Sequence, residues 1–123
     1  LGAGAWTASA AELCRLVAAI DGDPTMPDVI SPEAVRLMTQ EMPDHQFSLG
    51  WNYTPNGRPW IRTGSLVGTS AIVLRYPDGE CWVFITNTST WKGHKFSKDT
   101  MALFEKLRKR FGSKLPKRNL FVK

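Results

Sequence analysis

The chain has 123 residues, of which 42% are hydrophobic, and it carries a formal net charge of +5. A chain of this length buries roughly two-thirds of its unfolded surface on folding, and its apolar content excludes an intrinsically disordered protein. No apolar run approaches the roughly 18 residues that a membrane-spanning helix needs. We therefore expect one domain or part of one, without a membrane span.

Two helix patterns fill the first part of the chain. Thr7 or Ser9 can cap the first helix, whose apolar residues keep the spacing of one buried face: Leu13, Leu16, Val17 and Ile20. The turn residues Asp21-Gly22-Asp23-Pro24 end it. The second, short helix has Ser31 as its N-cap and a proline at its first position, and Pro43 marks its end.

A strand-like pattern follows the second helix. Leu49, Trp51 and Tyr53 alternate with small or polar residues, which is typical of a half-buried strand. The turn Pro55-Asn56-Gly57 leads from this pattern into a second extended run, which we expect to end at Thr63 and Gly64.

Two further strands and a helix complete the chain. Residues 69–76 and 81–86 are β-branched, apolar runs around the tight turn Pro77-Asp78-Gly79, which predicts an antiparallel hairpin. Their continuous apolarity implies that both faces of the sheet are covered. A last helix is expected over residues 97–110. The sequence therefore predicts the α+β class: a three-stranded or slightly larger antiparallel sheet with helices on both faces.

Cysteine and histidine usage predicts neither a metal site nor a cofactor. Cys14 and Cys81 lie in apolar helix and strand patterns, and one pair does not make a disulfide scaffold in a chain of this length, so we expect buried free thiols. His45 and His94 are lone histidines in polar segments, and neither has a second ligand at metal-binding spacing.

Basic residues gather at the C-terminal end. Between residues 92 and 123 there are eleven lysines and arginines against two acidic residues. Such a run can attract nucleic acid or an anionic surface. It is more typical of a solvated helix face, and the aromatic residues of this run are not interleaved with the basic ones as base stacking requires.

The segment from Trp60 to Ser70 carries the main functional signal. Arg62 supplies a positive charge and Thr63 a hydroxyl group, while Gly64 removes a side chain that would block the approach of a ligand to the strand. Trp60 neighbours Arg62 and can contact a ligand, although core packing is the more common role of a tryptophan.

Four segments resemble the serine β-lactamase and penicillin-binding protein family, in particular its class C-like members. Residues 4–13 are similar to its helix-opening segment Gly-Gly-x-x-Ser/Thr-x-x-Asp-Leu, and Leu49-Gly50-Trp51 to its Gly-Leu-Gly-Trp strand. Residues 62–70 are similar to its His-Thr-Gly-x-x-x-Gly-x-Ser/Ala run, and residues 83–87 to the apolar strand that ends in Asn. The resemblance covers most of the chain and implies part of the β-lactamase/DD-peptidase-like fold.

In that family a serine of a Ser-x-x-Lys motif forms an acyl-enzyme, and the Lys/His-Thr-Gly strand forms the opposite wall of the site. The resemblance implies that Arg62, Thr63, Gly64 and Ser65 form this wall, and that the N–H of Ser65 is one of two donors to the oxyanion. It also suggests a bacterial protein of the periplasm or the extracellular space. Peptides, lactams and small esters all remain possible substrates.

The sequence departs from the family pattern at decisive places. Arg62 replaces Lys or His, and arginine can clamp a carboxylate but cannot shuttle a proton at working pH. Neither Tyr-x-Asn nor Ser-x-Asn occurs. The one Ser-x-x-Lys string, Ser89-Thr90-Trp91-Lys92, follows a strand and is itself followed by Gly93, so it does not open a helix.

We therefore expect no catalytic residue within this chain, which would be the C-terminal portion of a longer serine hydrolase and inactive alone. Its partners would be the upstream portion of the same protein and a small molecule or peptide bearing a carboxylate or acyl group. A second copy can also pair with the exposed edge of the Thr63 strand. The alternatives are a non-catalytic binding module on the same fold, or an anion- or nucleic-acid-binding domain that uses the basic tail.

Overall fold

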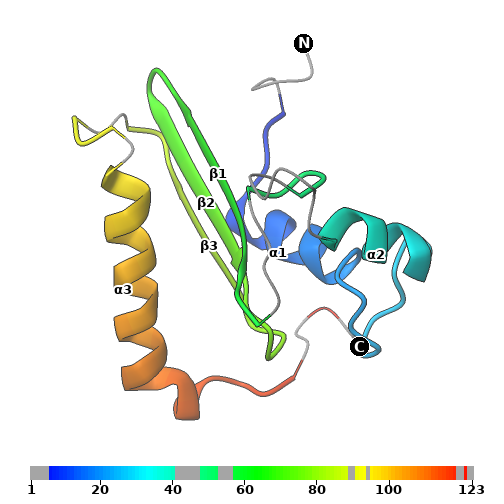
Figure 1. The fold of residues 1–123 in the computed structure, drawn as a ribbon. Helices are drawn as coiled ribbons and strands as arrows, with labels where there is room; N and C mark the ends of the chain where they lie inside the picture. The colour runs from blue at the N-terminus through cyan, green and yellow to red at the C-terminus, as the bar shows by residue number, and fades with distance from the viewer. Residues whose placement is uncertain are drawn as a thin grey trace.

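The computed structural model of the chain describes residues 6–40, 48–52, 57–88, 91–93, 95–118 and 121. Several residues discussed above lie outside these ranges: Pro43, His45, Tyr53, Pro55, Asn56, Ser89, Thr90 and His94. The elements, in chain order, are α1 (Ala10–Ala18), α2 (Pro32–Thr39), β1 (Trp60–Leu66), β2 (Thr69–Arg75), β3 (Cys81–Thr86), α3 (Lys95–Phe111) and a short 3-10 helix (Gly112–Lys114). Across the described ranges the fold is a small α+β domain with three helices and one open antiparallel sheet of three strands, in the order β1-β2-β3 (Figure 1). The expected class and the antiparallel pairing are confirmed.

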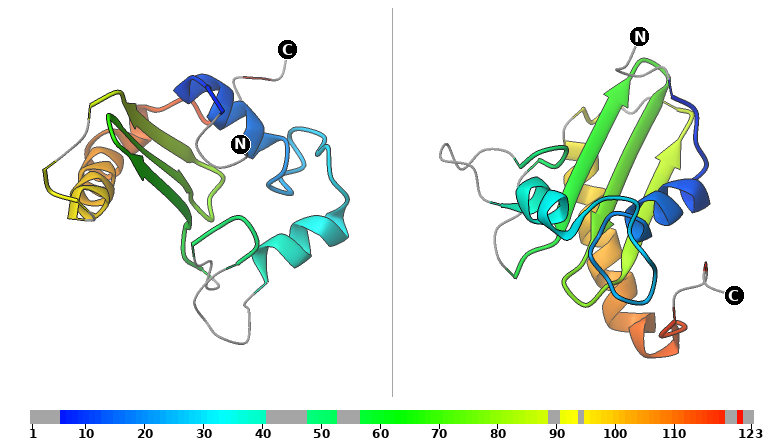
Figure 2. Two further views of the ribbon diagram at one scale, coloured as in Figure 1. Left: turned by 90° about the horizontal axis from the view of Figure 1, so that it is seen from above. Right: turned by 90° about the vertical axis from the view of Figure 1, so that its right-hand side faces the viewer.

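The sheet lies between two layers of helix. Helix α3 runs along one face, and α1 lies on the other, with α2 on the α1 side (Figure 1, Figure 2). Because side chains alternate along a strand, the side chains of β2 enter two separate cores. Ile72 and Leu74 pack with Phe104 of α3, while Val73 packs with Val17 of α1. The central strand is therefore buried on both faces.

Local signals explain where the first two helices begin. The Ser9 hydroxyl accepts a hydrogen bond from the Glu12 N–H, and the Glu12 carboxylate accepts one from the Ser9 N–H, which completes a capping box. Ser31 caps α2 in the same way, because its hydroxyl accepts from the Ala34 N–H. Ser31 is the cap that the sequence predicts for α2, and Ser9 is one of the two candidates, Thr7 and Ser9, that it offers for α1.

Two boundaries differ from the sequence expectation. Strand β1 does not end at Thr63 and Gly64 but continues to Leu66. Gly68, with a φ of +81°, forms a two-residue turn with Val67, and this turn places Leu66 opposite Thr69. Helix α3 begins at Lys95 rather than at residue 97.

Residues 48–52 do not form the expected strand. Ser48 and Trp51 make an isolated bridge around a turn at Leu49 and Gly50. Gly50 has a φ of +82°, far from the extended backbone of a strand. Trp51 is nevertheless buried, with its ring 5.5 Å from that of Trp60. The alternating pattern therefore reflected the burial of this tryptophan rather than a pleated strand.

A buried ion pair ties the segment after α1 to the end of β2. Arg75 Nε donates to Asp21 Oδ2 at 3.0 Å, and the two side chains are 11% and 5% exposed. The Arg75 guanidinium also donates to the carbonyl of Tyr76 and lies 5.2 Å from the ring centroid of Trp60. Loss of one partner of such a pair typically costs about 3–5 kcal/mol, because the other charge stays buried.

A second charged cluster anchors α3 to the turn between β2 and β3. Arg108 Nε donates to Glu80 Oε2 at 2.8 Å, and its guanidinium lies 3.7 Å from the ring centroid of Tyr76. Arg108 also pairs with Asp78, and Trp82 donates its indole N–H to Glu80. Partial burial opposes the ionisation of Glu80, but the hydrogen bonds from Arg108 and Trp82 and the charge of Arg108 hold its pKa below the ordinary value.

No helix within the described ranges is both long enough and apolar enough to cross a membrane.

The cluster of Arg108 and Glu80 makes the stability of the fold depend on pH. Because the pKa of Glu80 is lower in the folded than in the unfolded chain, its contribution is complete above the unfolded pKa and is lost as the pH falls through the folded pKa. We expect Glu80→Gln to lower the melting temperature at pH 7. We also expect the melting temperature of this variant to decrease less than that of the original protein when the pH is lowered from about 5 to about 3. Thermal unfolding at a series of pH values checks this.

Glu33→Gln is the matched control. Glu33 pairs with Arg36 on the surface, with side chains 75% and 65% exposed, and such pairs contribute little. Equal melting curves for Glu80→Gln and Glu33→Gln at every pH would show that the Arg108 cluster does not stabilise the fold.

Candidate functional site

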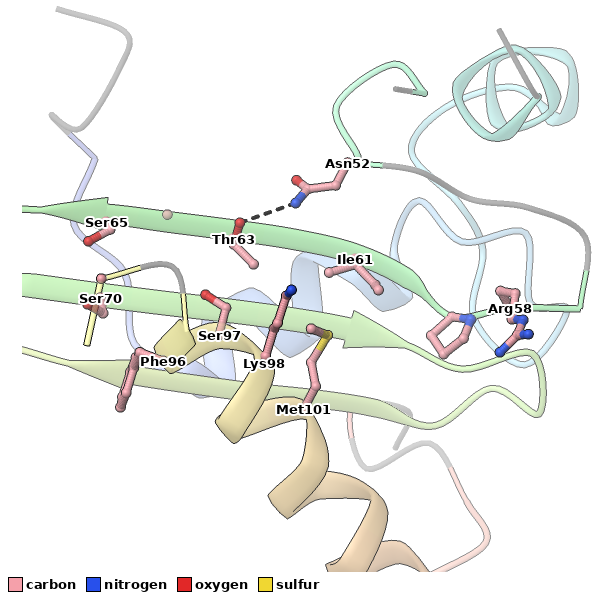
Figure 3. A pocket seen from close by; sticks show the side chains of 13 residues that line it. Asn52, Arg58, Ile61, Thr63, Ser65, Ser70, Phe96, Ser97, Lys98 and Met101 are labelled. Atoms are coloured by element: carbon pink, nitrogen blue, oxygen red, sulfur yellow. Dashed lines mark hydrogen bonds between the residues drawn. The ribbon is translucent and has the colours of Figure 1, made fainter. Parts of the chain in front are cut away.

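An open pocket of about 720 Å³ lies between the edge strand β1 and the first turns of α3 (Figure 3). Strand β1 and the residues before it contribute Arg58, Pro59, Ile61, Thr63, Gly64 and Ser65, and α3 contributes Phe96, Ser97, Lys98 and Met101. Asn52, Ser70 and Gly93 complete the lining. The site is therefore assembled from segments that are distant in the sequence.

The backbone of β1 presents hydrogen-bonding groups at this edge. The Asn52 N–H donates to the Ile61 carbonyl at 2.7 Å, so the backbone of Ile61 faces away from β2. In an antiparallel strand, the N–H and C=O of one residue point to the same side, and this side alternates along the strand. The backbone groups of Thr63 and Ser65 therefore also face away from β2. Among the described residues, no backbone group pairs with the N–H of Ser65.

The side chains at this edge leave room for a ligand. A Cβ atom built on Gly64 would meet no atom within 4 Å, so this glycine is not required by packing in the described chain. Thr63 accepts a hydrogen bond from the Asn52 amide at 3.2 Å, which fixes its hydroxyl at the rim (Figure 3). The Thr63, Gly64 and Ser65 of the sequence analysis are thus brought together at one pocket.

Arg62 and Trp60 are on the other side of β1. Because side chains alternate, Ile61, Thr63 and Ser65 share the α3 face, while Trp60 and Arg62 share the α1 face. Trp60 packs there against Trp51 and Arg75. Arg62 is exposed, and it has no ion pair with a described residue. The structure therefore separates these two side chains from the pocket.

The pocket contains cations that the sequence analysis did not single out. Lys98 extends from α3 toward β1, and Arg58 lies at the far end, just before β1 begins (Figure 3). The described lining contains hydroxyl groups and one amide but neither a carboxylate nor an imidazole. An anionic or carbonyl-bearing group therefore suits the pocket better than a cation does. The sequence signals for Lys98 were its place at the start of the last helix and its membership of the C-terminal basic run.

Ser70 adds an unusual hydroxyl group to the lining. The residue is 5% exposed, and its Oγ has no hydrogen-bond partner in the described chain. It lies directly opposite Ser65 in the β1–β2 register. A buried hydroxyl without a partner costs free energy, so Ser70 is a candidate to bond a ligand or a water molecule in the pocket.

The described residues hold no group of three potential metal ligands. They also lack a recognisable pair of nucleophile and base at the pocket, since no hydroxyl of the lining is hydrogen-bonded to a basic side chain. What the arrangement can do chemically is bind and orient a ligand. Two cations, several hydroxyl groups and the N–H of Ser65, which has no described backbone partner, surround an open volume.

Comparison with family models, with curated proteins and with solved structures found no match to this chain. The family assignment therefore stays a proposal that rests on the sequence motifs.

The free hydroxyl of Ser70 predicts an unusual response to mutation. Ser70→Ala removes a group that has no partner, so we expect the free energy of unfolding of the chain to stay unchanged or to rise slightly. The neighbouring Thr69 donates its hydroxyl to the Thr86 carbonyl at 2.9 Å, and Thr69→Val should cost about 0.5–1.5 kcal/mol. Urea unfolding measures both variants, and a larger loss for Ser70→Ala than for Thr69→Val would contradict this account of the site.

Proposed function

We propose that this chain is the C-terminal portion of a β-lactamase-family serine hydrolase and supplies the oxyanion-side wall of its active site. One observation carries the proposal: Thr63, Gly64 and Ser65 lie on an open sheet edge beside a pocket, and the N–H of Ser65 faces away from β2. Such an edge can donate to the oxyanion of an acyl-transfer reaction. The four sequence segments that resemble the family support the same assignment.

The bound group would be a carboxylate or an acyl carbonyl. Lys98 and Arg58 make the pocket positive, and the Thr63 hydroxyl and the Ser65 N–H supply directed hydrogen bonds. Arg62 would act from the other face of the strand, where its exposed guanidinium can clamp a carboxylate of a ligand that extends across the edge. The ligand would therefore contact both faces of β1 and not only the pocket.

The nucleophile and its base would come from the upstream portion of the protein. An oxyanion donor stabilises charge but does not attack a carbonyl, so the wall alone has no agent for the first step. A protein that kept the wall without the chemistry would instead be a binding module on the same fold. An upstream Ser-x-x-Lys helix distinguishes these two cases.

The basic C-terminal run gives a weaker alternative. Arg108 lies within this run, but it is engaged with Glu80 and Asp78 and stacked on Tyr76. The charge of Arg108 is therefore already paired within the fold and is not available to bind nucleic acid. DNA binding with a steep salt dependence would be the result that favours this alternative.

The chain alone should be catalytically silent. We expect no covalent adduct after incubation with a fluorescent penicillin or with a fluorophosphonate probe, because no hydroxyl of the described pocket lining is bonded to a basic side chain. Gel fluorescence and intact mass measure the outcome. A stoichiometric adduct on any serine, Ser89 included, would overturn the proposed division of labour between the chain and its upstream portion.

The wall itself is tested by a backbone substitution in the longer protein that carries Ser-x-x-Lys. Ser65→Pro deletes the N–H that faces away from β2, and proline is tolerated on an edge strand when its nitrogen faces outward. Loss of one oxyanion donor costs about 10²–10³ in rate, so the acylation rate should fall by that factor. Ser65→Ala keeps the N–H and is the matched control.

Stopped-flow acylation and thermal unfolding are measured on both variants. We expect acylation to be lost in Ser65→Pro, although the melting temperature of this variant stays close to that of Ser65→Ala. If both variants acylate at the rate of the original protein, the edge of β1 is not part of the oxyanion site.

A further inference from the structure

The two cysteines meet on the face of the sheet that lies opposite the pocket. Cys14 belongs to α1, and Cys81 is the first residue of β3. Helix α1 packs directly on β3. Leu13 and Val17 of α1 belong to the same core cluster as Cys81 and Val83, so this contact is built on an apolar layer.

Cys14 lies three residues before Val17, one turn earlier on α1, so its side chain lies on the helix face that packs on this layer. The neighbouring Cys81 thiol lowers the pKa of Cys14 to about 7, while the Cys14 thiol and burial raise the pKa of Cys81. Both side chains are partly exposed, and both thiols are free. Cys14 is therefore the better nucleophile of the pair, and a small reagent can reach it.

We propose that Cys14 and Cys81 are a thiol pair that closes to a reversible disulfide when the protein meets a small disulfide oxidant, and that this bond fastens α1 to β3. This modification is independent of the proposed hydrolase function. The sequence analysis expected two buried free thiols; both are free, but both are partly exposed. They come together because α1 folds back onto β3, although they are far apart in the chain.

The chemistry balances with glutathione disulfide as the oxidant. The Cys14 thiolate attacks one sulfur of the oxidant, which forms a mixed disulfide and releases one glutathione thiolate. Cys81 then gives its proton to solvent and attacks the sulfur of Cys14, which releases the second glutathione. The two protein thiols are oxidised, and the oxidant is reduced to two glutathione molecules.

Closure should stabilise the fold. The bond would close a loop of chain that contains α2, β1 and β2, and a disulfide that closes a long loop restricts the unfolded chain strongly. Such a constraint raises the melting temperature of a domain of this size by roughly 5 °C or more. The effect should vanish on reduction.

The test uses the chain with excess glutathione disulfide, followed by acid quench, alkylation and intact mass. We expect a monomer lighter by two hydrogen atoms, a cross-linked peptide pair that contains Cys14 and Cys81, and a raised melting temperature that dithiothreitol reverses. Cys81→Ser should instead accumulate one glutathione on Cys14, because no resolving thiol remains. Cys14→Ser should react much more slowly.

Each other outcome contradicts the proposal. A wild-type chain that carries two glutathione adducts would show that the thiols cannot reach each other, and a disulfide-linked dimer would show that they pair between copies. Two unreacted thiols would show that Cys14 is not an accessible nucleophile. If the disulfide closes but the melting temperature does not change, the bond does not fasten α1 to β3.

Discussion

Burial of β2 on both faces is the constraint on which the rest of the structure depends. Alternate residues of this strand enter two cores, with Ile72 and Leu74 on one side and Val73 on the other. Neither core forms unless a helix covers its face, so α1 and α3 are both required. Leu74 and Ile72 are each only 2% exposed, and truncation of such a side chain typically costs about 2–5 kcal/mol.

The two ionic clusters fix the positions of α1 and α3 on the sheet. Asp21 follows α1 and pairs with Arg75 at the end of β2, while Arg108 of α3 pairs with Glu80 beside the next turn. Both clusters lie at the same end of the sheet, next to the turn between β2 and β3. At the opposite end, where Leu66 and Thr69 close the other hairpin, the described ion pair joins Lys92 to Asp99 of α3; it is exposed and does not involve the sheet.

The position of the candidate site follows from this arrangement. With β2 in the centre, β1 has one side bonded to β2. On its other side the Asn52 N–H bonds to the Ile61 carbonyl, no described strand is paired there, and α3 begins close to that side. The first turns of α3 therefore place Ser97 and Lys98 opposite Thr63 and Ile61 (Figure 3). The sheet is the rigid layer, and the groups that can face a ligand are the backbone groups of β1 that are not bonded to β2.

Neighbouring residues determine the helix caps and the turn between β2 and β3, so sequence patterns predicted them. Ser9, Ser31 and Gly79 act within a few positions of themselves. The same patterns failed at Leu49 and Gly50, where burial of Trp51 imitated a strand.

The site was only partly predictable for the same physical reason. Thr63, Gly64 and Ser65 form one motif, but Lys98 reaches the pocket only through the packing of α3. The alternation of β1 also sends Arg62 away from Thr63, which a linear motif does not reveal. The contact between Cys14 and Cys81 likewise requires α1 to be docked on β3.

The central claim is that the backbone of β1 bonds to β2 at alternate residues and offers the others to a ligand. Amide hydrogen exchange of the isolated chain, measured residue by residue with nuclear magnetic resonance, tests it directly. The account predicts slow exchange for the N–H groups of Arg62 and Gly64, which face β2, and fast exchange for Ser65. Slow exchange at Ser65, equal to that at Gly64, would contradict it.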